Sequence, residues 1–377
     1  MTTTRARRCL VIGAGILGAS VAARLAAAGV RVTLLDQDQP GRATSRWSFA
    51  WLNSNDKAPR AYHDLNHAGM RAWAELAPDL DGDAWYRPAG HLELATADAA
   101  LEARVRRLTE WGYPARLVDA AEAARLEPAL RVPPGAVAAF FPEEGYLLTR
   151  PLIARLVARA RSHDAEVLTG EPGRVTGLEP GPAPRVRTAA GAVLTADDVV
   201  CCAGRWTPAL APELGTAPLI PSDTEGSAAP GLVVRVGPIA PPGPVRVVHT
   251  PEISLRPHPG GLHLEAPDAA SAVDLHTPEP ELTRWAEELL RRARRTVRGL
   301  DDARVMAVKV CVRPLPADGQ SIVGRIPGVN GLYVAVTHSG VTLAAHLSRL
   351  IAADLTTPTR PASLAPYTPA RFASDPA

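Results

Sequence analysis

The chain has 377 residues, of which 46% are hydrophobic and 21% are charged, so it has an ordinary globular composition and enough length for two domains. Its formal net charge of +2 argues against a nucleic-acid-binding protein, and no apolar stretch approaches the roughly 18 residues of a membrane-spanning helix. Four cysteines without paired spacing predict no disulfide framework, and the basic N-terminus leads into a strand rather than a signal peptide, so we expect a cytoplasmic protein.

Residues 9–36 carry a complete dinucleotide-binding pattern. An apolar run at residues 9–12 predicts a buried parallel strand, apolar residues at helical spacing follow, and a second strand at residues 30–35 ends on Asp36. The turn between the first strand and the helix has the G-x-G-x-x-G spacing and consists of Gly13, Ala14, Gly15, Ile16, Leu17 and Gly18.

Each position of this pattern has a physical reason. Gly13 allows a tight turn, Gly15 lets the backbone approach a pyrophosphate, and Gly18 lets helix and strand pack closely. The helix N-terminus offers free N–H groups to phosphates, and Asp36, 18 residues after the last glycine, can hold a ribose hydroxyl. The pattern predicts a bound dinucleotide, and the alternative is a glycine-rich turn without a ligand.

The segment 41–53 favours FAD over a nicotinamide cofactor. It is dense in aromatic side chains and in small hydroxyl residues such as Thr44 and Ser45. A nicotinamide enzyme of this type would run on through further strand–helix repeats, whereas a loop that returns along the ligand suits a larger, more buried cofactor. The alternative is an ordinary polar connection.

The rest of the chain is predicted to form two sheets with helices. Up to residue 195 we expect helices at 63–76, 101–111, 120–126 and 150–162. We also expect a strand at 86–96 and a turn-rich stretch at 140–146. The strands at 166–169, 173–179, 185–188 and 193–195 are expected to form a small antiparallel insert. Beyond it we expect a buried parallel strand at 198–202, strands at 232–236, 245–249, 253–256, 262–265 and 304–312, a helix at 281–298, and a last strand and helix from residue 331.

The late return of a nucleotide-type strand at 198–202 indicates that one domain is built from separated segments. The sequence therefore predicts an α/β (α+β) fold in which a Rossmann-type FAD-binding domain is combined with a mostly antiparallel substrate domain. The FAD-binding domain is expected to comprise residues 1–85, 146–215 and 313–377, and the substrate domain residues 86–145 and 216–312.

Cys311 lies in a strand with an informative alternation. One face carries Met306, Val308, Val310 and Val312, and the other carries Lys309, Cys311 and Arg313. Two cations on its own face would favour the thiolate of Cys311. The alternative is an incidental buried cysteine.

Two further positions are candidates for chemistry. His263 alternates with leucines and faces away from them, so it could carry a proton or a charge near a cofactor, or it could simply face solvent. Ser339 can cap the last helix, whose N-terminus, if aimed at a flavin, would stabilise negative charge on the reduced ring. The ten histidines show no metal-ligand spacing, so no metal site is expected.

The chain resembles the D-amino-acid oxidase-like family of FAD enzymes over nearly its whole length. The resemblance rests on the glycine motif with Asp36, on the Thr44-Ser45 loop, and on the stretches 199–206, 313–319 and 331–342. Beyond the glycine motif, the cofactor-binding residues that it implies are Asp36, Gln37, Thr44, Ser45, Val175, Ala203, Gly204, Trp206, Cys311, Ser339, Gly340, Val341 and Thr342.

The resemblance implies oxidation of a small amine or amino acid, with hydride transfer to flavin N5 and O2 as the acceptor. In the sarcosine oxidase branch of the family, a cysteine seven residues before an aspartate binds the flavin covalently, and Cys311 stands seven residues before Asp318. His263 matches the position of a lysine that activates oxygen in that branch, so a cationic histidine is expected to replace it.

The resemblance also has one departure. The branch has a lysine in the last strand–helix loop that grips the substrate carboxylate, but residues 341–344 contain no base. Arg46 or Arg60 would then have to supply the clamp, or the substrate is not a small amino acid. Aromatic residues such as Trp51 suggest an aromatic-walled pocket, although core packing explains them equally well. The predicted catalytic residues are His263, Arg46, Trp51 and His338.

Two alternatives remain open from the sequence. One is a flavin dehydrogenase of the same family that passes electrons to a quinone or carrier, which oxygen consumption with peroxide release would distinguish from an oxidase. The other is a non-catalytic nucleotide-binding or sensing protein, whose flavin no amine would reduce.

Overall fold

A six-stranded sheet holds the N-terminal strand at its centre. The computed structural model describes residues 6–95, 99–212, 219–222 and 226–372. The sheet has the order β19-β20-β13-β1-β2-β9, and all its neighbours are parallel except β19 and β20. Its strands are β1 (Arg8–Ile12), β2 (Arg31–Asp36), β9 (Glu166–Thr169), β13 (Asp198–Cys201), β19 (Ile322–Arg325) and β20 (Leu332–Val336).

Both faces of this sheet are covered, as is usual for a mostly parallel sheet. One face packs on helices α1 (Ile16–Ala27), α3 (Arg60–Leu76), α6 (Thr149–Ser162) and α10 (Gly340–Thr356). The other face packs on a small antiparallel sheet of β10 (Val175–Glu179), β11 (Arg185–Thr188) and β12 (Val193–Thr195). Alternate residues of β1 therefore belong to different cores, Val11 to the helical one and Leu10 to the other.

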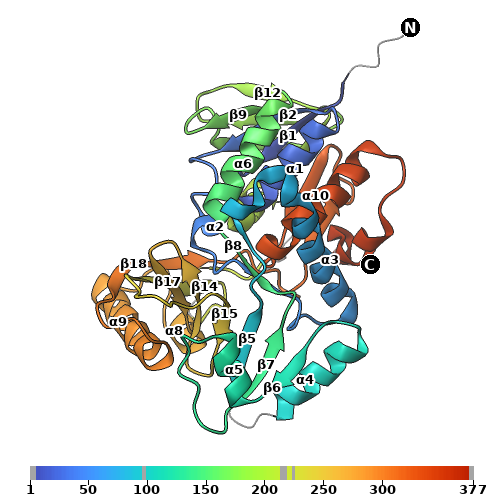
Figure 1. The fold of residues 1–377 in the computed structure, drawn as a ribbon. Helices are drawn as coiled ribbons and strands as arrows, with labels where there is room; N and C mark the ends of the chain where they lie inside the picture. Colours follow the sequence, from blue (N-terminus) through green and yellow to red (C-terminus); the bar gives the residue numbers. More distant parts are fainter. Residues whose placement is uncertain (1–5, 96–98, 213–218, 223–225, 373–377) are drawn as a thin grey trace.

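An eight-stranded sheet forms the second half of the molecule, below the first sheet in Figure 1. Its order is β18-β14-β17-β16-β15-β5-β7-β6, and all its pairs are antiparallel except β15 and β5. The strands are β5 (His91–Ala95), β6 (Arg116–Val118), β7 (Val137–Phe141), β14 (Pro230–Gly237), β15 (Val247–His249), β16 (Ser254–His258), β17 (Gly261–Glu265) and β18 (Arg304–Val312).

Three helices cover one face of the eight-stranded sheet. The second hydrophobic core packs this outer face on α5 (Ala120–Leu126), α8 (Pro267–Ser271) and α9 (Glu279–Thr296). Leu92, Val248, Leu255 and Leu264 belong to this core. Because side chains alternate along a strand, the residues between them face the other way. We call that side the inner face.

Short elements join the two sheets. A three-stranded sheet of β3 (Trp51–Leu52), β8 (Gly145–Leu147) and β4 (Tyr86–Arg87) lies between them, with α2 (Thr44–Trp47) beside it. The remaining helices are α4 (Ala99–Glu110), α7 (Thr207–Leu210) and the 3-10 turns Pro78–Leu80, Gly82–Ala84, Gly204–Trp206, Ala362–Tyr367 and Pro369–Phe372. No helix within the described ranges is long and apolar enough to cross a membrane.

The mixed α/β architecture predicted from the sequence is confirmed, and several local predictions are wrong. Residues 166–169 do not belong to the antiparallel insert, because β9 pairs in parallel with β2. The stretch 140–146 is not only a turn, since it contains the end of β7 and the start of β8. A strand of four residues has too few alternating side chains to indicate which sheet it joins.

The sequence prediction is also wrong about Met306, which it places on the apolar face of strand 304–312. A register shift lets Arg235 pair with Ala307 and Val236 with Val305, so Met306 is an extra residue that is 59% exposed. The expected strand 86–96 is divided into β4 and β5, and its end at Thr96 lies outside the described residues, as does the predicted boundary at 215/216. The division of the chain into two domains stays a prediction.

Candidate active site

A cavity of about 470 Å³ opens at the carboxyl ends of the parallel strands β1, β2, β13 and β20. Residues from the segments 12–17, 35–48, 173–175, 202–210 and 335–341 line it, together with Pro314. Open α/β sheets bind ligands at this edge, beyond the ends of their parallel strands. The cavity therefore lies where the glycine motif predicts a nucleotide.

The glycines of the motif are required by their surroundings. Gly13 has φ +97°, and a Cβ there would lie 2.5 Å from the carbonyl oxygen of Cys202. A Cβ on Gly18 would lie 1.8 Å from the carbonyl oxygen of Gly13. Gly15 is less constrained, because its Cβ would meet only the Ser45 hydroxyl, at 3.2 Å. Turn and close packing are confirmed as the reasons for Gly13 and Gly18.

The first helix and the second strand present polar groups at the cavity. The Ile16 N–H, at the start of α1, donates to the Ser45 hydroxyl at 3.0 Å. Asp36 accepts from the N–H groups of Ala14 at 2.6 Å and Asp38 at 2.9 Å. Burial nevertheless raises the pKa of Asp36. A carboxylate has about four lone-pair sites, so Asp36 retains capacity for ribose hydroxyls.

The inner face of the eight-stranded sheet is rich in cationic and imidazole side chains. Arg235 on β14, Arg256 on β16 and His263 on β17 stand opposite one another across these strands. Arg235 stacks on Trp47 of α2, with its guanidinium carbon 4.2 Å from the ring centroid. Neither arginine forms an ion pair with a carboxylate of the described residues.

Arg256 is only 4% exposed, and its donors are taken up by backbone oxygens and one imidazole. It donates to the carbonyls of Phe49, Pro257 (2.7 Å) and Ser48 (3.4 Å), and to Nδ1 of His263 at 3.2 Å. Burial lowers its pKa to about 10, so it stays charged at neutral pH. Arg256 thus fixes the backbone of residues 48–49, and Ser48 lines the cavity.

A family model described as FAD dependent oxidoreductase (DAO) matches residues 8–354. The chain belongs to this DAO family. It is 27% identical over 401 residues to the uncharacterized oxidoreductase YurR of Bacillus subtilis, with 96% of this chain and 98% of that protein covered. It is 25% identical over 364 residues to glycine oxidase of Geobacillus kaustophilus, covering 92% of this chain and 91% of that protein.

Solved structures share the whole fold of this DAO-family chain. Glycine oxidase from Geobacillus kaustophilus superposes with a TM-score of 0.83 at 24% identity, covering 98% of this chain and all of that one. Iminodiacetate oxidase (IdaA) from Chelativorans sp. BNC1 gives a TM-score of 0.80 at 25% identity, covering 96% and 99%. The predicted family membership and the Rossmann-type arrangement are confirmed.

The residues of this DAO-family chain fit FAD. The glycine turn leaves no Cβ in the path of a pyrophosphate, and the cavity continues from Asp36 to Pro314 and His338. Fourteen residues that the sequence assigns to the cofactor line this cavity: Gly13, Gly15, Ile16, Leu17, Asp36, Gln37, Thr44, Ser45, Val175, Ala203, Gly204, Trp206, Gly340 and Val341. The lining also includes Ser48, Arg174, Cys202, Arg205 and Pro314, which the sequence analysis missed.

Five assigned residues do not line the cavity. Ala14 and Gly18 lie within the glycine turn behind its surface. Ser339 does not cap α10 with its side chain, contrary to the prediction, because its hydroxyl accepts from the Tyr62 hydroxyl at 3.2 Å. Thr342 is buried and donates to the carbonyl of Trp51 at 3.3 Å.

Cys311, the fifth, is not a thiolate. Its Sγ lies 3.9 Å from the carbonyl oxygen of Thr44, and the residue is 8% exposed. Burial, reinforced by the Glu265 carboxylate, raises the pKa of Cys311 to about 11. The prediction from strand alternation is therefore wrong, since a shared face with cations does not compensate for loss of solvent.

The four predicted catalytic residues are not gathered at one place. His338 faces the cavity, where burial and the nearby Lys57 and Arg313 lower its pKa to about 4. The side chain of Arg46 is exposed, and its backbone carbonyl accepts a hydrogen bond from Arg235. Arg60 also points outward, with its Nε 3.8 Å from Asp64. His338 is thus the predicted catalytic residue that lines the cavity.

His263 and Trp51 lie deeper in the molecule. His263 is fully buried on the inner face, and burial, with Arg256 and Arg235, holds its pKa well below the ordinary value. The expected cationic histidine is therefore neutral, and the positive charge at this place belongs to Arg256. The indole N–H of Trp51 donates to Glu144 at 3.0 Å, so this ring belongs to another cluster.

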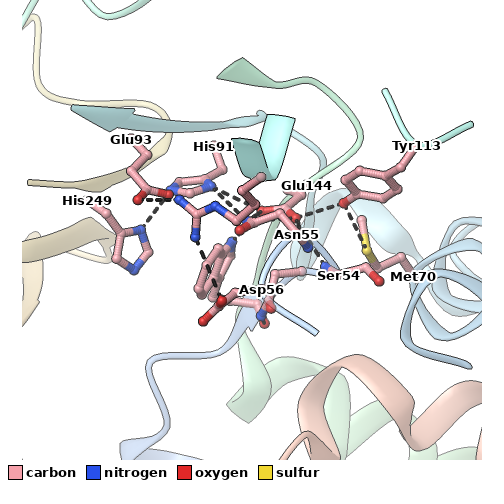
Figure 2. Close-up of polar contacts among 12 residues, drawn as sticks. Ser54, Asn55, Asp56, Met70, His91, Glu93, Tyr113, Glu144 and His249 are labelled. Carbon is pink, nitrogen blue, oxygen red and sulfur yellow. Dashed lines mark hydrogen bonds and ion pairs between the residues drawn. The ribbon is translucent and has the colours of Figure 1, made fainter. Parts of the chain in front are cut away.

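That cluster surrounds Glu144, which follows β7 and is completely buried (Figure 2). Its carboxylate accepts from the N–H groups of Ser54 (3.1 Å) and Asn55 (3.0 Å) and from the Tyr113 hydroxyl (2.7 Å). The Asn55 amide and His91 also reach it, at 2.9 and 3.1 Å. Sequence reasoning missed Glu144, because its partners come from segments far apart in the chain.

Proposed function

We propose that this chain oxidises the C–N bond of a small amine that carries an anionic group such as a carboxylate. The observation that carries the proposal is the inner face, where neither Arg235 nor Arg256 forms an ion pair with a carboxylate of the described residues, although the charge of Glu265 acts on Arg256. A buried cation is costly unless an opposite charge approaches it. The printed names of two similar proteins, glycine oxidase and iminodiacetate oxidase, also describe amines with carboxylates.

In this proposal the cofactor is FAD held without a covalent bond. The glycine turn and the α1 N-terminus would hold the pyrophosphate, Asp36 a ribose, and residues 335–341 the flavin end. When bound, FAD supplies the two-electron oxidant for the carbon next to the nitrogen. The raised pKa of Cys311 and its place outside the cavity lining support a free thiol.

Arg256 has two roles in this proposal. Its charge attracts the anionic group of the substrate, and its hydrogen bonds to the carbonyls of Ser48 and Phe49 keep the wall of the cavity in place. The same positive charge favours reduction of O2, which we propose as the acceptor, because negative charge develops on oxygen. Arg256 thus takes the place that the sequence analysis gives to His263.

The direct test is anaerobic mixing of the holoenzyme with matched pairs of amines. Glycine, sarcosine and iminodiacetate carry a carboxylate, whereas methylamine and dimethylamine are matched compounds without one. We expect bleaching of the flavin absorbance only with the carboxylate-bearing compounds, and peroxide formation when air is admitted. Equal bleaching by the analogues without a carboxylate would contradict the anionic substrate, and reoxidation by a quinone but not by O2 would identify a dehydrogenase.

The role of Arg256 is tested by Arg256→Gln against Arg256→Lys. Losing the charge that attracts the substrate and the hydrogen bonds that hold residues 48–49 predicts an increase in KM of about ten- to a hundredfold for Arg256→Gln, with a smaller increase for the lysine variant that keeps the charge. Arg60→Gln, on the exposed start of α3, is the control and should leave KM unchanged. An unchanged KM in Arg256→Gln would remove this residue from the site.

A further inference from the structure

Glu144, His91 and His249 form a continuous hydrogen-bonded chain across three strands or their ends (Figure 2). Glu144 Oε2 lies 3.1 Å from Nδ1 of His91, and Nε2 of His91 lies 2.7 Å from Nδ1 of His249. The chain begins in the interior, where Glu144 and His91 are fully buried, and ends at His249, which is half-buried. The proposed function leaves this arrangement unused.

The carboxylate sets the direction of the chain. Burial would raise the pKa of Glu144, but hydrogen bonds from His91 and Tyr113 outweigh it, and the pKa is lowered overall. An ionised carboxylate can only accept, so Nδ1 of His91 carries the proton. Nε2 of His91 then accepts from Nδ1–H of His249. The remaining nitrogen of the chain, Nε2 of His249, is therefore left with a free lone pair.

His249 lies at the end of β15 on the inner face. Its ring centroid is 5.8 Å from that of Phe49, which in turn is 5.5 Å from that of His263. Phe49 follows Ser48, a residue of the cavity wall. The indole of Trp51 covers another side of the imidazole, with centroids 4.4 Å apart. Within the described part of the chain, no hydrogen bond to Nε2 of His249 is formed.

We propose that His249 is the general base that takes the proton from the ammonium form of the substrate. This rests on the proposed function, because an amine must be neutral before its C–H bond can be oxidised. The N–H bond of the ammonium breaks and a bond from the proton to Nε2 of His249 forms. Glu144 stays ionised and stabilises the positive charge through His91, which is a positioning residue.

The surroundings of His249 keep its imidazole neutral before a substrate binds. Burial, followed by the neighbouring His91 and Arg104, lowers the pKa of His249 well below its ordinary value, so the imidazole is neutral and able to accept. Arg104 of α4 is itself paired with Glu93 on β5 and lies 3.8 Å from Asp56. Glu93 and Asp56 thus offset part of the positive charge that Arg104 directs at His249.

The first test needs no substrate. Nitrogen-15 NMR of the histidine-labelled holoenzyme reports which ring nitrogen carries a proton, with assignments from His249→Gln and His91→Gln. We expect His249 protonated at Nδ1 and free at Nε2, and His91 protonated at Nδ1. A proton on Nε2 of His249 would overturn the proposal, since that nitrogen could not accept.

The second test is the pH dependence of anaerobic flavin reduction by an amine that the screen identifies. With His249 present, we expect a nearly constant rate between pH 7 and pH 10. In His249→Gln only the free amine reacts, so for an ammonium with a pKa of about 10 the rate should fall about tenfold per pH unit below it. Equal losses at pH 7 and pH 10 would indicate a structural role only and contradict the proposal.

Two variants separate this effect from damage to the cluster. His276→Gln changes an exposed histidine outside the cluster and should keep the wild-type pH profile. Glu144→Gln removes the charge at the inner end of the chain and should resemble His249→Gln. A pH profile changed by His276→Gln as much as by His249→Gln would overturn the proposal. If no amine bleaches the flavin, the proposed function fails, and the NMR result alone decides whether the ordered chain exists.

Discussion

Two buried charges of opposite sign hold the same stretch of backbone. Arg256 donates to the carbonyls of residues 48–49, and Glu144 accepts from residues 51–55. Both charges are surrounded mainly by dipoles. Backbone carbonyls accept from Arg256, whereas backbone N–H groups, the Tyr113 hydroxyl and the His91 imidazole donate to Glu144. Such charges are strongly destabilising when one partner is removed. The segment 48–55, which begins at the cavity wall with Ser48 and continues beside the inner face, is therefore held at both ends.

Cys311 provides a prediction at the scale of a single residue. Because its buried thiol is neutral below a pKa of about 11 and lies outside the cavity lining, we expect FAD to be released by acid precipitation. The yellow colour should move to the supernatant, and Cys311→Ala should retain the flavin content of the wild type. Flavin that stays with the precipitate of the wild type but not of Cys311→Ala would establish the covalent bond instead.

The elements of the nucleotide half could be predicted from the sequence because their signals are local. The strand, the glycine turn, α1 and β2 occupy one continuous stretch. The space around Gly18 is limited by Gly13 within that stretch, and the space around Gly13 by Cys202, which directly follows β13. The cluster around Glu144 has no such local signal. His249 and His91 meet because β15 pairs in parallel with β5, although the two strands are far apart in the chain. The contact between His249 and His91 depends on the order of the strands in the sheet, which no local residue pattern predicts.

The turn before α1 gives a prediction at the scale of an element. Gly13→Ala would bring a Cβ to 2.5 Å from the carbonyl oxygen of Cys202, so the turn must shift. Overpacking of about 1–3 kcal/mol predicts that the Kd for FAD rises about tenfold or more, measured by flavin fluorescence quenching. Gly29→Ala, at the other end of α1, is the matched control.

Gly29 has φ +80° and open space around its Cα, so alanine there strains the backbone without a clash. We expect that variant to lose about 1 kcal/mol of stability and to keep its affinity for FAD. An unchanged Kd in Gly13→Ala would mean that the turn adapts, and the steric argument would then be wrong.

At the scale of the whole molecule, the cavity is formed by segments from distant parts of the chain. Residues 12–17, 35–48, 173–175, 202–210 and 335–341 meet there, and the same wall continues through residues 48–49 to Arg256 on the eight-stranded sheet. A ligand that fills the cavity therefore contacts the first and the last segments of the six-stranded sheet at once. The binding energy of this ligand therefore stabilises the packing of these distant segments against one another.

Removal of FAD should consequently lower the melting temperature of the protein in one cooperative transition. A ligand that binds only the folded state stabilises it by about 1.4 kcal/mol for each tenfold rise in free concentration above Kd. Calorimetry of the apoprotein with increasing FAD should show Tm rising steadily with the logarithm of concentration. ADP, which can occupy the end near Asp36 but lacks the flavin, should produce a smaller shift. An equal shift by ADP would show that the flavin end, between Pro314 and His338, adds nothing to the binding.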